Sequence, residues 1–255
     1  MSAAAYTPEE LMAIVISREV RDGETTAVGT LSPIPTAGVL LAREQHAPHG
    51  TFFFYKSDYQ REVWWPFRHG SKEFYDFAQQ GRLDLFFVSA AQIDQFGNIN
   101  LNVIGSPTQP TVRLPGGAGT PMLWTMVRRV IVFKTDHSPR AFVPHVDFIT
   151  CPGLPPTGTR RAGGLSKIVT PMAVLRWNRE QQQIELESVT PGYTAAEVQA
   201  QTGFQLVSPA QFTQTPAPTD EELHTLRTSV HQHLSHIYPQ FAAAPSHTPP
   251  GSVRY

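Results

Sequence analysis

Short apolar runs are the feature that most restricts how this sequence can fold. Residues 51–55 are Thr-Phe-Phe-Phe-Tyr, residues 84–88 are Asp-Leu-Phe-Phe-Val, and residues 129–133 are Arg-Val-Ile-Val-Phe. These runs are too short for helices, and a run that stays apolar is typical of a strand buried on both faces. Such strands occur in parallel sheets that helices cover on each side.

Helical patterns separate these strands. Thr7 is a good N-cap, Pro8 suits the first helical position, and Gly23 can end the helix that they begin. Further helices are expected at residues 34–46, 71–81, 194–202 and 220–236, and further strands at 25–30, 99–104, 146–149, 169–177 and 183–187. The alternation predicts an α/β fold with an open, mostly parallel sheet and helices on both faces.

The sequence predicts one domain, residues 1–238, because it contains neither an internal repeat nor a clean linker. Residues 239–255 are rich in Ala, Pro and Ser and are expected to form a flexible tail. Two further stretches, 106–121 and 151–166, are rich in Gly and Pro and are expected to lack regular structure. They are candidate functional loops, with a plain surface crossing as the alternative.

Composition excludes several classes of function. Lys and Arg total 20 and Asp and Glu total 21, so a net charge of −1 offers no footprint for nucleic acid or an anionic membrane. Cys151 is the only cysteine and cannot form an intramolecular disulfide; we expect it to be buried and structural. The chain lacks a membrane-length apolar run and a signal-peptide pattern, which predicts a cytoplasmic protein. Charged residues are only 16%, which fits a surface partly covered by a partner.

A polar segment, residues 89–100, directly follows the predicted strand at 84–88. Ligands of open α/β sheets bind outside the carboxyl ends of the strands, so this segment is a candidate site. The amide of Gln92 can donate to a carbonyl or a carboxylate. Residues 94–98 also have the composition of a tight turn, which leaves a purely structural explanation open.

A glycine-rich loop at residues 114–120 contains Gly116, Gly117 and Ala118. Successive backbone N–H groups in such a loop can form an oxyanion hole or an anion nest. The loop lacks the Lys of a phosphate-binding P-loop and the spacing of a dinucleotide fingerprint. The histidines are scattered, and no metal-binding motif or nucleophilic-serine motif is present.

Three segments in order resemble the β subunit of family I coenzyme A transferases, of the glutaconate type. They are residues 91–100, residues 115–119, and residues 187–198 with Thr202, Gly203 and Phe204. The resemblance implies the NagB/RpiA/CoA-transferase type of α/β fold and an obligate α subunit, usually in an α2β2 assembly. It also implies a site between the subunits that takes a coenzyme A thioester as substrate, with no tightly bound cofactor or metal.

The family reaction uses a glutamate just after a buried strand, and at that place this chain has Tyr55, Lys56, Ser57 and Asp58. No Glu occurs between Gly50 and Arg61. Asp58 could replace the glutamate, although its side chain is one methylene shorter. Lys56 could pair with a substrate carboxylate or stabilise an enolate, with Tyr55 and Ser57 beside it.

By the same resemblance, Gly116, Gly117 and Ala118 would donate N–H groups to the thioester oxyanion, while Gln92 and Asn98 would position the acyl group or shape the loop. Three functions stay open: coenzyme A transfer, acyl-CoA hydrolysis or decarboxylation without the glutamate, and a non-catalytic partner subunit. An isomerase of sugar phosphates is less favoured, because the necessary carboxylate and cations cannot be placed.

Overall fold

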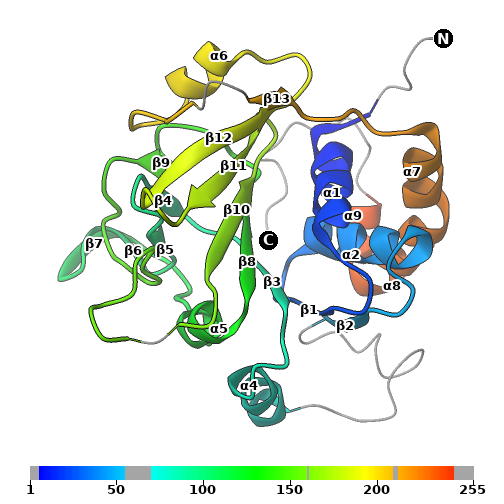
Figure 1. Ribbon diagram of the computed structural model, residues 1–255, viewed down its shortest axis with the longest axis horizontal. Helices are drawn as coiled ribbons and strands as arrows, with labels where there is room; N and C mark the ends of the chain where they lie inside the picture. Colours follow the sequence, from blue (N-terminus) through cyan, green and yellow to red (C-terminus); the bar gives the residue numbers. More distant parts are fainter. Residues whose placement is uncertain (1–5, 55–69, 160, 209–211, 244–255) are drawn as a thin grey trace.

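An eight-stranded sheet forms the centre of the molecule (Figure 1). The computed structural model describes residues 6–54, 70–159, 161–208 and 212–243. The strands, in their order across the sheet, are β13 (Thr213–Gln214), β12 (Gln183–Val189), β11 (Ala173–Asn178), β10 (Leu165–Val169), β8 (Arg129–Phe133), β3 (Leu85–Val88), β1 (Thr25–Val28) and β2 (Thr51–Phe54). Neighbours are parallel except where β11 pairs with β10 and with β12, which confirms the predicted sheet.

Both faces of the sheet are buried, because alternate side chains of each strand enter different cores. Leu85, Phe87 and Ile131 belong to the core on one face. The helices on that face, at the right of Figure 1, are α1 (Pro8–Glu19), α2 (Pro33–Gln45), α7 (Asp220–Thr225), the π-helical turn η1 (Leu226–Val230), α8 (His231–Ile237) and α9 (Pro239–Ala242). The unbroken apolar runs of the sequence are explained by this double burial.

The second face is covered by small sheets as well as by helices. Phe86 and Val130 enter this core. The elements here are α4 (Ser71–Gln79), α5 (Thr120–Met126), α6 (Ala195–Ala200), a three-stranded sheet of β4 (Gln92–Asp94), β5 (Ile99–Asn100) and β9 (Phe142–Val143), and the hairpin of β6 (Val103–Ser106) and β7 (Gln109–Arg113). None of the helices among the described residues is long and apolar enough to cross a membrane.

Several predicted segments differ from the structure. The strand expected at 169–177 is divided by residues 170–172 into the end of β10 and β11. The strand expected at 99–104 is divided into β5 and β6, because Asn102 N and Val103 N donate to the Asn100 side chain at 2.9 and 3.3 Å and turn the chain. The strand expected at 146–149 was wrong: this segment is irregular, and the N–H groups of Val146 and Asp147 donate to side chains. The stretch 106–121, expected to be irregular, contains β7 and the start of α5.

Ordered structure continues past residue 238, where the domain was expected to end. Helix α9 lies within the expected tail, and its Phe241 and Ala242 pack against the core on the helical face. The single-domain organisation itself stays a prediction.

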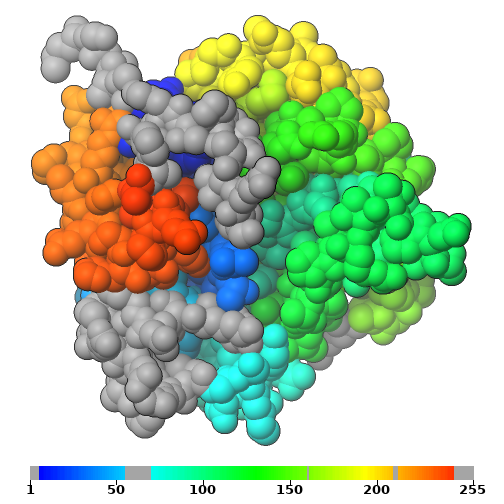
Figure 2. Space-filling model, turned by 180° about the vertical axis from the view of Figure 1, so that it is seen from behind, coloured from blue at the N-terminus to red at the C-terminus, as the bar shows by residue number. Residues whose placement is uncertain are grey.

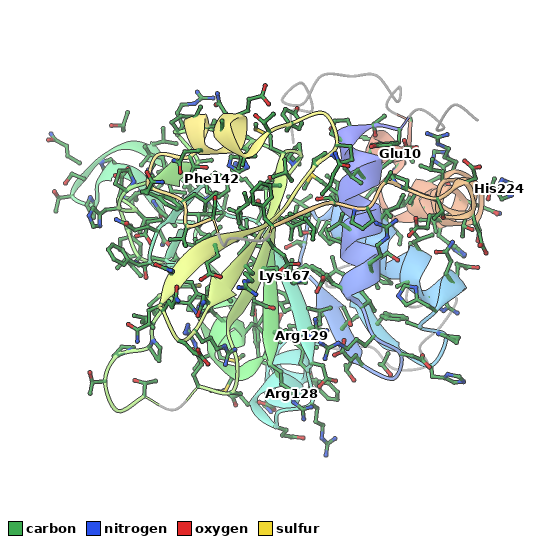
Figure 3. All side chains as sticks on the ribbon, turned by 45° about the horizontal axis from the view of Figure 1, so that its top comes forward. Glu10, Arg128, Arg129, Phe142, Lys167 and His224 are labelled. Atoms are coloured by element: carbon green, nitrogen blue, oxygen red, sulfur yellow. The ribbon has the colours of Figure 1, made fainter. Side chains whose placement is uncertain are left out.

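Lys167 on β10 joins α1 to the sheet. Its ammonium donates to Glu19 at the end of α1 at 2.6 Å and to Glu187 of β12 at 2.7 Å; Figure 3 shows Lys167 beside Arg129, which also pairs with Glu19. We expect Lys167→Met to lower the free energy of unfolding by about 1–2 kcal/mol, because Glu19 and Glu187 lose the ammonium that bridges them, while Glu19 keeps its pair with Arg129.

Urea unfolding measures this change. Lys72→Met is the matched control, because Lys72 forms an exposed helical pair with Asp76 whose loss should cost under about 0.5 kcal/mol. Equal losses in the two variants would contradict the assignment.

Candidate functional site

Gln92 on β4 lies in a buried hydrogen-bond network rather than at an open surface. Its side chain is only 6% exposed. Its Nε2 donates to Asp147 Oδ2 at 3.0 Å, and its Oε1 accepts from Asn100 Nδ2 at 2.7 Å and from Asp147 N at 3.0 Å. The network joins β4 to β5 and to the loop that follows β9. A contact between Gln92 and a substrate stays a prediction.

Asp94 forms the centre of the turn between β4 and β5. It is 1% exposed, and its Oδ1 accepts from the backbone N–H groups of Phe96 and Asn98, each at 3.0 Å. Its Oδ2 accepts from Asn98 Nδ2 at 3.0 Å and from Val146 N at 3.3 Å. The turn chemistry expected from residues 94–98 is therefore present, and one carboxylate maintains it.

Asn98 connects this turn to a second loop. While its Nδ2 donates to Asp94, its Oδ1 accepts from Gly153 N at 2.9 Å. Gly153 is packed so closely that a Cβ there would lie 1.8 Å from the carbonyl oxygen of Phe96. Of the two roles considered for Asn98, the described contacts are those of a residue that shapes the loop.

The glycine-rich loop, defined as residues 115–119 in the central part of the stretch 114–120, has an unusual backbone. Gly116 has φ +92° and Ala118 has φ +44°, while Gly119 has right-handed helical angles. A left-handed residue followed by a right-handed one, as at Ala118 and Gly119, turns successive N–H groups toward one side, as in an anion-binding nest. Ala118 is a non-glycine residue in the left-handed region, and such strain is typical of functional sites.

The amides of this loop are used unequally. Gly116 N donates to Leu101 O at 2.9 Å, so this amide maintains the loop. The N–H groups of Gly117 and Ala118 have no acceptor among the described residues. Of the three amides expected to face an oxyanion, Gly117 and Ala118 therefore remain candidates, and Gly116 acts as a support.

Close neighbours explain why the loop needs glycine. A Cβ on Gly117 would lie 2.6 Å from Thr150 Cγ2, and a Cβ on Gly119 would lie 2.1 Å from the hydroxyl oxygen of Tyr75. Tyr75 belongs to α4, the first described element after residue 69. After Phe54, the last residue of β2, the next described element is therefore the helix that contacts the glycine-rich loop.

Tyr55, Lys56, Ser57 and Asp58, the expected reactive residues, lie outside the described residues. Their roles stay predictions.

Cys151 is buried, pairs with Ile99 in an isolated bridge, and has its thiol pKa raised to about 12 by burial. This agrees with the structural role expected for it, because the reactive form of cysteine is the thiolate.

Sequence reasoning missed three polar residues around the loops: Asn102, Asp147 and Thr150. Asn102 and Thr150 contact each other beside the glycine loop, and Asp147 completes the Gln92 network. The alternation of Asn98, Asn100 and Asn102 was a signal for at least one of them, because repeated amides along a strand and turn seldom lack hydrogen-bond partners.

The fold and these loops define an open α/β protein with a backbone nest suited to an anion. A family model described as Coenzyme A transferase matches residues 50–201. The chain belongs to this family, within which it corresponds to the β subunit.

Curated relatives share this assignment. The chain is 30% identical to the β subunit of 3-oxoadipate CoA-transferase from Pseudomonas knackmussii, over 88% of this chain and 93% of the relative. It is 27% identical to the β subunit of glutaconate CoA-transferase from Acidaminococcus fermentans, over 84% and 89%. It is 31% identical to the cholesterol ring-cleaving hydrolase IpdB subunit of Rhodococcus jostii, over 65% of each chain.

Solved structures share the fold. The decarboxylase AibA/AibB matches with a TM-score of 0.76 and 24% identity, over 88% of this chain and 94% of that one. Glutaconate coenzyme A-transferase of Acidaminococcus fermentans matches with a TM-score of 0.77 and 22% identity, over 92% and 99%.

Proposed function

We propose that this chain is the β subunit of a heteromeric enzyme that acts on an acyl-CoA thioester at a site shared with an α-type subunit. The observation that supports it best is the glycine-rich loop, whose Gly117 and Ala118 amides have no acceptor among the described residues. Preorganised amides stabilise the negative charge that develops on a thioester oxygen when a nucleophile adds to its carbonyl carbon. In this proposal the coenzyme A thioester is a substrate and no cofactor is tightly bound.

The proposal of a partner rests on the relatives, each of which is named as one subunit: two of a CoA-transferase and one of a hydrolase. Several large apolar side chains are exposed on the loops around the site: Phe96, Phe148, Ile149 and Leu154. The β6–β7 hairpin, which bears exposed Val112, projects from the same side of the molecule (Figure 1, Figure 2). Exposed apolar side chains mark a protein interface where they are contiguous. We propose that the α-type subunit covers them, in an α2β2 assembly in the cytoplasm.

The reaction itself has two candidates. Coenzyme A transfer would pass through an acyl anhydride on a protein carboxylate, for which Asp58 is the nearest replacement of the missing glutamate. The absence of Glu between Gly50 and Arg61 favours the second candidate, hydrolysis or decarboxylation of an acyl-CoA without that carboxylate. In that case Lys56 would pair with a substrate carboxylate or an enolate.

The test is to purify the chain together with the α-type subunit encoded beside it. A panel of acyl-CoA thioesters is then assayed for exchange of coenzyme A, release of free coenzyme A, and release of carbon dioxide. We expect turnover of at least one thioester by the complex and none by either subunit alone. A complex that forms and turns over no thioester would leave this chain a non-catalytic partner and overturn the proposal.

Asp58→Ala separates the two reactions. Transfer through an aspartyl anhydride requires the carboxylate, so exchange should be abolished in this variant. Unchanged exchange would exclude Asp58 as the nucleophile. Release of free coenzyme A or carbon dioxide that persists in Asp58→Ala would instead identify the glutamate-independent chemistry.

A further inference from the structure

The backbone of Asn102 is hydrogen-bonded to the residue that precedes the glycine-rich loop. It lies in the turn between β5 and β6, where its N–H donates to Asn100 Oδ1 at 2.9 Å. Its carbonyl oxygen accepts from Leu114 N, also at 2.9 Å, immediately before the loop begins. Both bonds use backbone atoms of Asn102, so they remain when its side chain is changed.

The side chain of Asn102 is oriented by Thr150. Leu101 N donates to Thr150 Oγ1 at 2.8 Å, and the Thr150 hydroxyl donates to Asn102 Oδ1 at 2.6 Å. Since the Oδ1 atom is held in this way, the two N–H bonds of Nδ2 point away from Thr150. Among the described residues Nδ2 has no acceptor, and it lies 3.7 Å from the position that a Cβ of Gly116 would take.

The donor group of Asn102 therefore lies against the same loop whose Gly117 and Ala118 amides have no acceptor among the described residues. Thr150 contacts both parts, since its methyl group packs on Gly117 while its hydroxyl holds Asn102. Donors gathered in this way, with no acceptor in the described part of the chain, suit an oxygen that gains negative charge.

We propose that Asn102 Nδ2 is a further hydrogen-bond donor to the oxyanion bound by Gly117 and Ala118, with Thr150 as the positioning residue that aims it. The inference rests on the proposed function and deepens it, because it assigns a catalytic side chain to the oxyanion site. The ligand is the thioester oxygen of the acyl-CoA substrate. Asn102 forms and breaks no covalent bond and transfers no proton.

Asn102→Asp is the sharpest test, because it keeps the side-chain size and the acceptor for Thr150 but replaces the donor with a carboxylate oxygen. In the complex with the α-type subunit, we expect kcat for the thioester that the panel assay identifies as a substrate to fall about 100-fold, with KM changed less than about threefold. Asn102→Ala should lose about 10- to 100-fold. Thr150→Val should lose less, about three- to tenfold, because the donor remains but is no longer aimed.

A purely structural role predicts a different result. The unfolding temperatures of the Asn102 variants would then fall while kcat per folded complex stayed unchanged, and that outcome would overturn the inference. Gln232→Glu, an amide-to-acid change at an exposed position of α8, controls for the added charge and should leave kcat unchanged. If the wild-type complex turns over no thioester, the proposed function and this inference both fail. If the wild-type complex is active and the Asn102 variants have the same kcat, only this inference fails.

Discussion

Replacing Asp94 with Ala is expected to lower the free energy of unfolding by about 3–5 kcal/mol, although the residue only ends a short strand and begins a turn. The buried carboxylate accepts three backbone N–H groups, from Phe96, Asn98 and Val146, and one side-chain amide. Removing it leaves four part-buried donors without their acceptor, and a buried group left in this way costs about 1–3 kcal/mol. Partial entry of water limits the sum.

Urea unfolding of Asp94→Ala measures the loss. Glu180→Ala is the control, because it removes one exposed carboxylate that has no ion pair among the described residues and should cost under about 0.5 kcal/mol. Asp94→Asn should be intermediate, since one oxygen still accepts while the new NH2 faces other donors. A loss below about 1 kcal/mol in Asp94→Ala would show that the turn holds its shape by other means.

The central strands could be predicted because burial on both faces produces an unbroken apolar run, which is visible in a few neighbouring residues. Helix α1 was predictable for the same reason: Thr7 and Glu10 form a capping box within one turn of the chain. Both signals depend only on neighbouring residues. Tertiary structure did not have to be known.

The site depends on contacts between distant residues, which the sequence does not show. Gln92 was expected to position the acyl group or to shape the loop, but nothing in the sequence indicated that its amide donates to Asp147, 55 positions away. The apolar residues at 146–149 suggested a strand, but Phe148 and Ile149 are exposed beside the site. A run of apolar residues indicates a strand only if it is buried, and these side chains are free to meet a partner instead.

A second large effect is expected from a buried histidine. His137 lies after β8, is 7% exposed, and stacks on Phe142 of β9 with ring centroids 4.2 Å apart. Its Nδ1 lies 2.8 Å from Thr170 Oγ1 and its Nε2 lies 3.1 Å from Thr202 Oγ1. Since the Thr202 hydroxyl donates to Val198 O, Nε2–H of a neutral ring can donate to Thr202. The ring thus joins the sheet to the end of α6.

Burial lowers the pKa of His137 to about 4, against an ordinary value of 6.5. Between these two pH values the unfolded chain binds a proton that the folded protein does not. The free energy of unfolding therefore falls as the pH falls from 6.5 to 4, by up to about 3 kcal/mol from this residue alone. Above pH 6.5 the ring is neutral in both states and contributes no slope.

Urea unfolding at several pH values, compared between wild type and His137→Gln, measures this contribution. The variant should be less stable than wild type at about pH 7, because it loses the stacking on Phe142. Its stability should nevertheless fall less between pH 6.5 and 4, so the two curves should converge toward acid. Other groups titrate alike in both proteins, so the difference between the curves isolates His137.

His224→Asn is the matched control, because His224 is exposed on α7, at the opposite side of the molecule from Phe142 (Figure 3). Its curve should run parallel to that of wild type. Parallel curves for wild type and His137→Gln would mean that the ring takes up its proton at the same pH in the folded protein as in the unfolded chain, which would contradict the lowered pKa. In that case the Thr170 and Thr202 hydroxyls would both serve as acceptors, and the contact between the sheet and α6 would survive at acidic pH.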